Sequence, residues 1–183
     1  MDTEAFTRST IGKLYSRLLA TAMESRFRYR FFAPTRILKG VASLRDQAVL
    51  EIGCGTGFFT IPTAQLIGDH GSLVAMDILP ESVELVSSKV QAARLQNVRV
   101  VKGDALNTNL DSESFQTVLL FGVIPAPMLP LGRLLTEMQR VLKSEGILAV
   151  WPPVPGWLPR SILKSGQFSF VNKRSGVYNF KRC

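Results

Sequence analysis

The sequence predicts a doubly wound α/β fold, in which helices cover both faces of a mostly parallel β-sheet. Three observations predict it. From residue 48 onward, short apolar runs alternate with stretches of helical periodicity. A glycine-rich turn, "GCGTG" at 53–57, separates the first apolar run from the first helical stretch. The length of 183 residues and the hydrophobic content of 46% suit one domain with a sizeable core.

The apolar runs are predicted strands, because each is short and is bounded by glycine, proline or acidic residues. In chain order they are "AVLEIG", "GSLVAMD", "VRVVKGD", "FQTVLLFG" and "ILAVW". The tail "GQFSFVNKRSGVYNFKR" predicts two more strands, joined by a turn around residues 173–176. The expected result is a seven-stranded, Rossmann-like, mostly parallel sheet that a C-terminal antiparallel hairpin closes at one edge.

Helical periodicity fills the intervals between the strands. The predicted helices are "FFTIPTAQLIG", "PESVELVSSKVQAARL", which opens with Pro80, and "PLGRLLTEMQRVLKSEG", for which Gly146 is the expected stop. Residues 1–44 precede this alternation and contain one further amphipathic helix, with Ile11 and Leu18 on its apolar face. A cover packed on the domain is the preferred role of this helix, and a helix that lies on a membrane surface is the alternative. We therefore expect an N-terminal helical cover at 1–44, packed on a domain at 45–183.

Basic residues are concentrated at the two ends of the chain. Residues 1–50 hold nine Lys and Arg against four Asp and Glu, and residues 157–183 hold six against none. Residues 51–156 hold seven against ten, and the net charge of the chain is +8. The preferred interpretation is that these charges form solvated faces. The alternative is contact with a polyanion, either nucleic acid or an anionic membrane.

The hydropathy of the chain, its first ten residues and its cysteines bear on its location and on disulfide or metal content. No apolar run is long enough for a membrane-spanning helix, and "MDTEAFTRST" carries acids where a secretion signal would be basic. We expect a cytoplasmic protein, with association at a membrane surface as an additional prediction. The two cysteines, Cys54 and Cys183, indicate neither a disulfide framework nor a metal cluster.

The glycine-rich turn predicts a ligand that lies against bare backbone. Gly53, Gly55 and Gly57 occupy the point where the first strand turns into its helix, at the sheet edge where such folds bind ligands. A dinucleotide fingerprint, G-x-G-x-x-G, would require glycine at position 58, which is Phe58. The spacing therefore disfavours a nicotinamide-dependent oxidoreductase, which is the rival enzyme class.

Three acids lie at the ends of the first three predicted strands. Glu51 precedes the glycines, where it would repel a pyrophosphate and favour a ligand with an ammonium group. Asp77 ends the second strand, where a carboxylate can accept both ribose hydroxyls. Asp104 ends the third strand, where it can accept from an adenine amino group. The three acids predict a ligand made of an amino acid, a ribose and a base.

The motifs "VLEIGCGTG", "VAMDILPESVE", "VVKGDALN" and "EMQRVLKSEGIL" resemble the successive motifs of the class I S-adenosylmethionine-dependent methyltransferases. The resemblance covers roughly residues 45–152, and "SFQTVLLFG" with "VLKSEG" is similar to the quinone C-methyltransferases and their small-molecule relatives. It implies S-adenosyl-L-methionine as cofactor. The implied binding residues are Glu51, Gly53, Gly55, Gly57, Asp77, Ile78, Asp104 and Ala105, with Phe121 beside the methionine end.

Methyl transfer mainly requires alignment of the reacting atoms, so few catalytic side chains are needed. Tyr15, Tyr29 and Tyr178 are the candidates that could assist the acceptor, and no metal site is predicted. We expect a small hydrophobic or amphiphilic acceptor, such as a quinone, a lipid or a thiol, because apolar residues of three segments should meet at the open edge. These residues are Phe31, Phe32, Pro34, Phe121, Ile124, Pro125, Met128, Trp151, Pro152 and Trp157.

Two alternatives share the same motifs. A non-catalytic subunit would bind S-adenosylmethionine only as a ligand, and it would methylate nothing. A nucleic-acid methyltransferase would use the basic ends, but no aromatic-rich recognition module accompanies them. A small molecule is therefore the favoured acceptor over nucleic acid.

Overall fold

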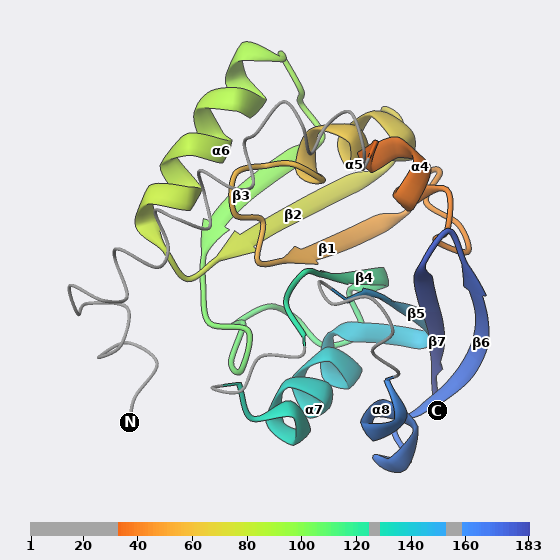
Figure 1. The fold of residues 1–183 in the computed structure, drawn as a ribbon. Helices are drawn as coiled ribbons and strands as arrows, with labels where there is room; N and C mark the ends of the chain where they lie inside the picture. The colour runs from red at the N-terminus through yellow and green to blue at the C-terminus, as the bar shows by residue number, and fades with distance from the viewer. Residues whose placement is uncertain (1–32, 125–128, 153–158) are drawn as a thin grey trace.

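The computed structural model describes residues 33–124, 129–152 and 159–183. Seven strands form one sheet in the order β3-β2-β1-β4-β5-β7-β6, as Figure 1 shows. The strands are β1 (Ala48–Ile52), β2 (Ser72–Asp77), β3 (Val98–Lys102), β4 (Phe115–Phe121), β5 (Leu142–Trp151), β6 (Phe168–Arg174) and β7 (Val177–Arg182). The first five run parallel, and β7 pairs antiparallel with both β5 and β6. The predicted fold class and the C-terminal hairpin are confirmed.

Helices cover both faces of the sheet (Figure 1). One face carries α4 (Pro34–Leu38), α5 (Thr60–Ile67) and α6 (Pro80–Ala92), and the other carries α7 (Leu131–Val141) and α8 (Arg160–Lys164). Proline at the start of α6 and Glu81 in its first turn favour a helix beginning there. Within the described ranges, every helix is too short or too polar to span a bilayer.

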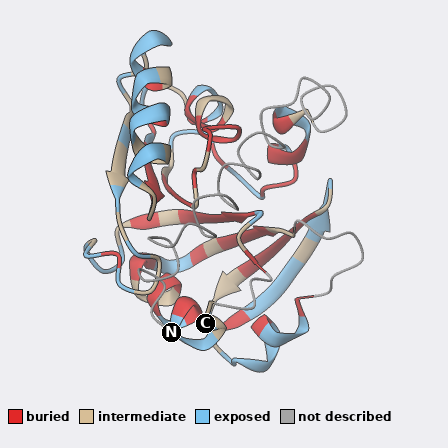
Figure 2. Ribbon diagram, turned by 60° about the vertical axis from the view of Figure 1, so that its left-hand side comes forward, coloured by how far each residue is buried: buried red, intermediate tan, exposed pale blue. Residues whose placement is uncertain are grey.

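The core lies on both faces of the sheet because strand side chains point alternately to either side. In β1, Val49 packs on the α4 and α5 side, whereas Leu50 and Ile52 pack on the α7 and α8 side. Figure 2 shows that the central strands are almost entirely buried. With both faces covered, the carboxyl edge of the parallel strands is the part of the sheet left for a ligand.

The predicted helix over 130–146 is wrong beyond Val141. Leu142 already belongs to β5, is fully buried, and pairs with Phe115 of β4. The register then shifts, and Glu145 takes a φ of 66° within the irregular segment. Strand pairing and burial of Leu142 therefore override the helical preference of this segment.

The predicted N-terminal cover is described only in part, because residues 1–32 lie outside the described ranges. The described part packs on the domain: Ile37 and Leu38 share a core cluster with Val49 of β1. Behind α4, the Asn179 side-chain amide of β7 donates to the Gly40 carbonyl at 2.8 Å. The packing agrees with a cover, and the division at 44/45 stays a prediction.

Candidate functional site

The glycine loop, residues 53–57, connects β1 toward α5 at the carboxyl edge of the sheet. Gly53, Gly55 and Gly57 have φ values of 72°, 53° and 80°, in the left-handed region that favours glycine. Gly53 and Gly55 are partly exposed, whereas Gly57 is buried. A Cβ at Gly57 would lie 3.3 Å from Cγ2 of Val86 on α6. The first two glycines are thus accessible to a ligand, and the third lets α6 pack closely.

Four of the five backbone N–H groups of the loop have acceptors within the protein. Gly53 and Cys54 donate to the Met76 carbonyl at 2.8 and 3.0 Å, and Gly57 donates to the Cys54 carbonyl at 2.8 Å. Gly55 donates to Oδ2 of Asp77 at 2.8 Å. A phosphate-binding loop instead directs such groups at the phosphate. The arrangement fits a ligand that lies against the backbone without a pyrophosphate.

Two buried carboxylates flank the loop. Glu51 accepts a 2.7 Å hydrogen bond from the Thr60 hydroxyl. Burial, and to a smaller extent the neighbouring Asp77, raises the pKa of Glu51 to about 8 against the effect of that bond. Burial also raises the pKa of the Asp77 carboxyl, while the N–H groups of Leu79 and Gly55 oppose the rise. Among the described residues, no basic side chain forms an ion pair with either acid, so the pair suits a cationic ligand.

The remaining predicted contacts with the ribose and base lie on the neighbouring strands. Asp104 follows β3, is exposed, and accepts the Leu106 N–H through Oδ1 at 2.8 Å. Ala105, which follows Asp104 in the chain, and Ile78, which follows Asp77, are half-buried. The structure thus brings Glu51, Asp77 and Asp104 to the same edge, at three adjacent strands.

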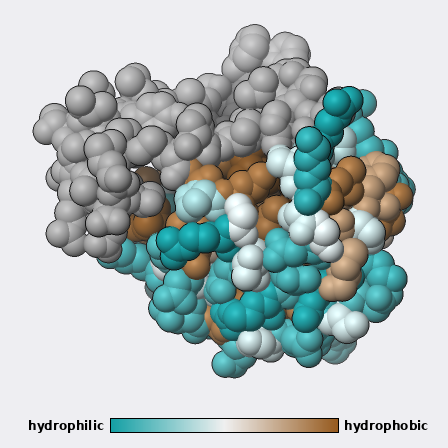
Figure 3. Space-filling view, turned by 90° about the horizontal axis from the view of Figure 1, so that it is seen from below, coloured by the Kyte–Doolittle hydropathy of each residue, from teal (hydrophilic) through white to brown (hydrophobic). Residues whose placement is uncertain are grey.

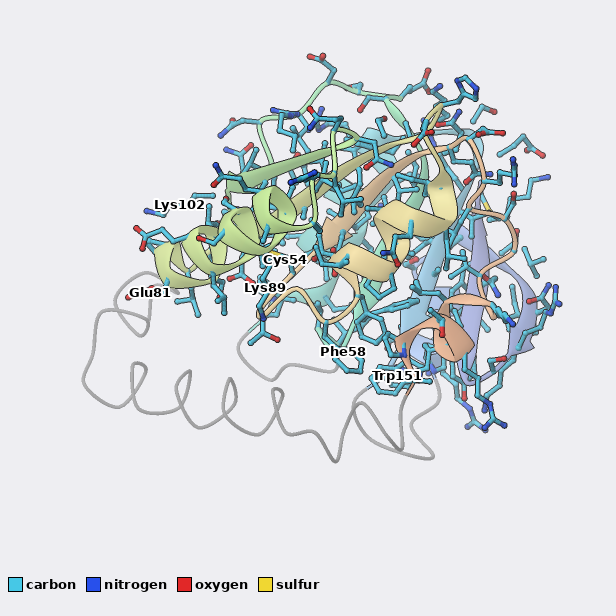
Figure 4. All side chains as sticks on the ribbon, turned by 90° about the horizontal axis from the view of Figure 1, so that it is seen from above. Cys54, Phe58, Glu81, Lys89, Lys102 and Trp151 are labelled. Carbon is cyan, nitrogen blue, oxygen red and sulfur yellow. The ribbon has the colours of Figure 1, made fainter. Side chains whose placement is uncertain are left out.

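Phe121, predicted beside the methionine end, ends β4 and is buried in an aromatic cluster. Its ring centroid lies 4.9 Å from that of Phe59. Phe59 also contacts Phe58 at 4.9 Å and Trp151 at 5.7 Å. Figure 4 shows Phe58 and Trp151 on the same side of the molecule. The ring of Phe121 therefore packs in the core, and its contact with a cofactor stays a prediction.

The predicted apolar wall is only partly described, and its described members do not form one surface. Pro34 and Ile124 are buried, and Trp151 and Pro152 are half-buried. Ile124 packs on the α7 and α8 side, opposite to Phe121. The other predicted wall residues, Phe31, Phe32, Pro125, Met128 and Trp157, lie outside the described residues.

Of the three tyrosine candidates, only Tyr178 is described; Tyr15 and Tyr29 lie outside the described ranges. Tyr178 belongs to β7, is 6% exposed, and packs in the core on the α7 and α8 side. The Lys173 ammonium lies 4.5 Å from its ring centroid. These contacts give the ring a packing role, and assistance to an acceptor stays a prediction.

Two other groups near the loop bear on its chemistry. Burial, and then Glu51 and Asp77, raise the pKa of the Cys54 thiol, so it stays protonated and is a poor nucleophile. Within 33–124, 129–152 and 159–183, no three His, Cys, Asp or Glu side chains are grouped in a way that could hold a metal ion.

Sequence reasoning missed two contacts that shape the site. The Lys89 ammonium of α6 donates to the Thr56 carbonyl at 2.8 Å, and Thr60 of α5 bonds Glu51. Neither contact has a signal in the sequence, because both depend on how α5 and α6 pack against β1 and the loop.

The family described as "Methyltransferase domain" matches residues 49–146, more than half of the chain. A demethylmenaquinone methyltransferase of Listeria welshimeri is 34% identical over 114 residues, covering 60% of this chain and 48% of that protein. One of Staphylococcus aureus is 31% identical over 114 residues, covering 62% and 46%. The chain spans about half the length of these curated relatives.

Solved structures share the fold at low sequence identity. A SAM-dependent methyltransferase from Aquifex aeolicus has a TM-score of 0.75 at 21% identity, covering 89% of this chain and 95% of that one. Geranyl diphosphate C-methyltransferase from Streptomyces coelicolor A3(2), solved with S-adenosyl-L-homocysteine, has a TM-score of 0.67 at 14% identity, covering 80% and 64%. These two structures support the fold, and the family follows from the match over 49–146. The chain belongs to the class I S-adenosylmethionine-dependent methyltransferases.

Proposed function

We propose that the chain transfers the methyl group of S-adenosylmethionine to a small hydrophobic or amphiphilic acceptor. The observation that carries the proposal is the glycine loop, where four of the five backbone N–H groups are bonded within the protein and which Glu51 and Asp77 flank. Such a loop suits a cationic donor without a pyrophosphate. The similarity to demethylmenaquinone methyltransferases favours a small-molecule acceptor over nucleic acid.

We assign donor binding to residues at the carboxyl edge of β1 to β4. They are Glu51, Gly53, Gly55, Gly57, Asp77, Ile78, Asp104, Ala105 and Phe121. In this assignment Gly53 and Gly55 provide partly exposed backbone, and Gly57 shapes the loop from its buried position. Each oxygen of Asp77 takes one backbone N–H, which leaves lone pairs for ribose hydroxyls. Glu51 would supply negative charge for the ammonium group by losing its proton as the cation binds.

The protein's contribution to the reaction would be mainly orientation. S-adenosylmethionine, when bound, supplies a methyl group on a positively charged sulfur. The loop and the strand-end acids would hold the donor while the acceptor approaches in line. Orientation of this kind can lower a barrier by about 7–11 kcal/mol.

For the acceptor, we propose a position beside Trp151 and Pro152, which are half-buried at the end of β5. The turn between β6 and β7 borders this place, because a Cβ at Gly176 would lie 3.2 Å from Nε1 of Trp151. Behind Trp151, the buried rings of Phe59 and Phe58 continue the aromatic packing toward the glycine loop. An aromatic border next to the donor site suits an apolar acceptor.

We also propose that the basic C-terminal region holds the enzyme near an anionic membrane. Lys164, Lys173 and Arg174 are exposed, and so are Leu163 and Phe170, at 45% and 51%. Figure 3 shows apolar patches among hydrophilic ones on the α7 and α8 side of the molecule. Each charge near an anionic surface contributes about 1 kcal/mol. Flotation with phosphatidylserine vesicles should therefore decrease as salt increases, and phosphatidylcholine vesicles should bind little at any salt concentration.

The test of the acceptor class is an unbiased labelling experiment. The protein is incubated with S-adenosylmethionine carrying a radiolabelled methyl group and with a cell extract, and label is measured in the organic, aqueous, nucleic-acid and protein fractions. We expect label in the organic fraction, and none with the Gly55→Val variant. Label in RNA or DNA would contradict a small apolar acceptor. Donor binding with no labelled fraction would identify a non-catalytic subunit.

A further inference from the structure

Lys89 connects α6 to the glycine loop. Its ammonium donates to the Thr56 carbonyl at 2.8 Å, across 33 positions of the chain. This distance is typical of a charge-assisted hydrogen bond. Figure 4 shows Lys89 reaching from α6 toward the loop that carries Cys54. Lys89 is half-buried, so the bond is partly shielded from water.

The contact belongs to a continuous packing between α6 and the loop. Val86, one helical turn before Lys89, is fully buried and lies 3.3 Å from the position of a Cβ at Gly57. The Lys89 stem approaches the same position, with Cδ at 3.8 Å. The helix thus packs two side chains against Gly57, and the ammonium of the second reaches on to the preceding carbonyl.

Lys89 complements the role of Asp77. The Asp77 carboxylate accepts a hydrogen bond from the Gly55 N–H, and the Lys89 ammonium donates one to the Thr56 carbonyl. Two side chains of opposite charge therefore bond the backbone of adjacent loop residues. Both side chains come from the unit formed by β2 and α6. A loop with three glycines has much conformational freedom to lose. Holding it from two directions before the ligand arrives reduces the ordering cost of binding.

We infer that Lys89 is a positioning residue for the methyl donor: through the Thr56 carbonyl, it keeps the glycine loop in the shape that the donor binds. The inference rests on the donor-binding role proposed for the loop. Because Lys89 acts through the loop, its loss should weaken donor binding and leave turnover at saturating donor nearly unchanged.

The test compares Lys89→Met, which keeps the apolar stem and removes the ammonium, with Lys89→Arg, which restores a cationic donor. Lys143→Met is the matched control, because Lys143 is exposed on β5 at the opposite edge of the sheet. Calorimetry with S-adenosylmethionine should give a dissociation constant about tenfold higher for Lys89→Met. Lys89→Arg should recover most of the affinity, and Lys143→Met should bind like the wild type.

Two further measurements separate positioning from general stability. Amide hydrogen exchange of Gly55 and Gly57 in the ligand-free protein should be about tenfold faster in Lys89→Met, with core strands unaffected. Methylation of extract at saturating donor should stay within about twofold of the wild type, since binding rather than chemistry is changed.

The outcomes distinguish this inference from the proposed function. An unchanged dissociation constant with unchanged loop exchange would overturn the role of Lys89 alone. A loss of affinity that Lys89→Arg does not reverse, accompanied by faster exchange throughout the domain, would show a general structural role and would also overturn it. A wild-type protein that binds no S-adenosylmethionine would instead overturn the donor site on which the inference rests.

Discussion

Glu51 at the end of β1 and Glu137 on α7 are both buried carboxylates, and their surroundings shift their pKa values in opposite directions. Glu137 accepts hydrogen bonds from the N–H and hydroxyl of Thr108 at 2.8 and 2.7 Å, and from the Arg140 guanidinium at 2.7 and 2.9 Å. The Arg140 hydrogen bonds foremost lower the pKa of Glu137 to about 2. Glu51 has the Thr60 hydroxyl and a neighbouring acid, and its pKa rises to about 8.

The difference distinguishes the Glu137 cluster from the proposed donor site around Glu51. The negative charge of Glu137 is neutralised inside the protein, where the cluster ties α7 to the segment after β3. Glu51 and Asp77 have no basic partner among the described residues, and burial raises the pKa of both carboxyls, so a bound cation would favour their ionised forms. The glycine loop lies beside Glu51 and Asp77, and not beside Glu137. Variants in the two regions should therefore separate ligand binding from stability.

The largest effect is expected at Gly55. The substitution Gly55→Val adds a β-branched side chain at a φ of 53° and at a partly exposed point of the loop. We expect the dissociation constant for S-adenosylmethionine to increase more than about a hundredfold, equivalent to about 2.7 kcal/mol. Calorimetry checks this. Gly132→Val on α7, where a Cβ has nothing within 4 Å, is the control and should bind normally.

Asp77→Ala should have the next largest effect on binding. It removes the predicted acceptor of the ribose hydroxyls, and it also removes the acceptor of the Gly55 and Leu79 N–H groups. We expect donor affinity to fall tenfold to a hundredfold, about 1.4–2.7 kcal/mol. Chemical denaturation should show a lower free energy of unfolding as well, because two N–H groups lose their partner. An unchanged dissociation constant would show that ribose binding does not use this acid.

Sequence reasoning correctly predicted the elements that local pattern determines. Alternating apolar runs predicted the strands, and the turn residues Ser175 and Gly176 lie within the predicted hairpin turn. It failed at Leu142, where strand pairing with Phe115 ends the helix. This pairing joins two separate segments of the chain, so the local pattern does not predict it. The short helix α8 was not predicted either, since five residues carry too little periodicity.

For the site, the sequence indicated which residues reach the carboxyl edge but not their partners. The glycines and the three acids lie where strand order and spacing predict. Contacts such as that of Lys89 with Thr56 determine which N–H groups stay available and which charges are compensated. The spacing of residues in the sequence does not predict such contacts. Phe121 illustrates the limit: its strand end was predicted, and its packing on Phe59 was not.

The pH dependence of stability should sharpen the comparison. Because the pKa of Glu51 is raised to about 8 from 4.5, the folded state binds a proton that the unfolded state has lost between these pH values. Stability from this group is therefore present below pH 4.5 and is lost as pH rises toward 8, by about 1.4 kcal/mol for each pH unit. Urea denaturation between pH 5 and 8 should show a decrease in the free energy of unfolding in the wild type and a smaller decrease in Glu51→Gln, where Asp77, whose pKa is also raised, still contributes.

Binding provides a second test of the same carboxylate. A cationic donor favours ionised Glu51, so binding at neutral pH should release a proton, and affinity should increase as pH rises toward 8. Calorimetry in buffers of different ionisation enthalpy measures the proton release. Equal proton release by the wild type and by Glu51→Gln would mean that another group responds to the ligand.

The smallest effect is expected from Glu137→Gln, which keeps the shape of the side chain and removes its charge. The amide oxygen can still accept from Thr108, but the charge-assisted bonds with Arg140 are lost. We expect the free energy of unfolding at neutral pH to decrease by about 1–2 kcal/mol. Donor affinity should stay within about twofold, because the α7 cluster is no part of the proposed site.

Glu137 changes the stability of the fold with pH in the opposite direction to Glu51. A carboxylate whose folded pKa is depressed stabilises the fold above its unfolded pKa of 4.5 and loses that contribution as pH falls toward 2. Partial exposure of Arg140 to solvent reduces the size of the effect. Acid unfolding should therefore be less steep in Glu137→Gln than in the wild type, while Glu51→Gln changes only the slope above pH 4.5. If Glu137→Gln also weakened donor binding, the two carboxylates would be coupled, and the separation of a stability cluster from a ligand site would fail.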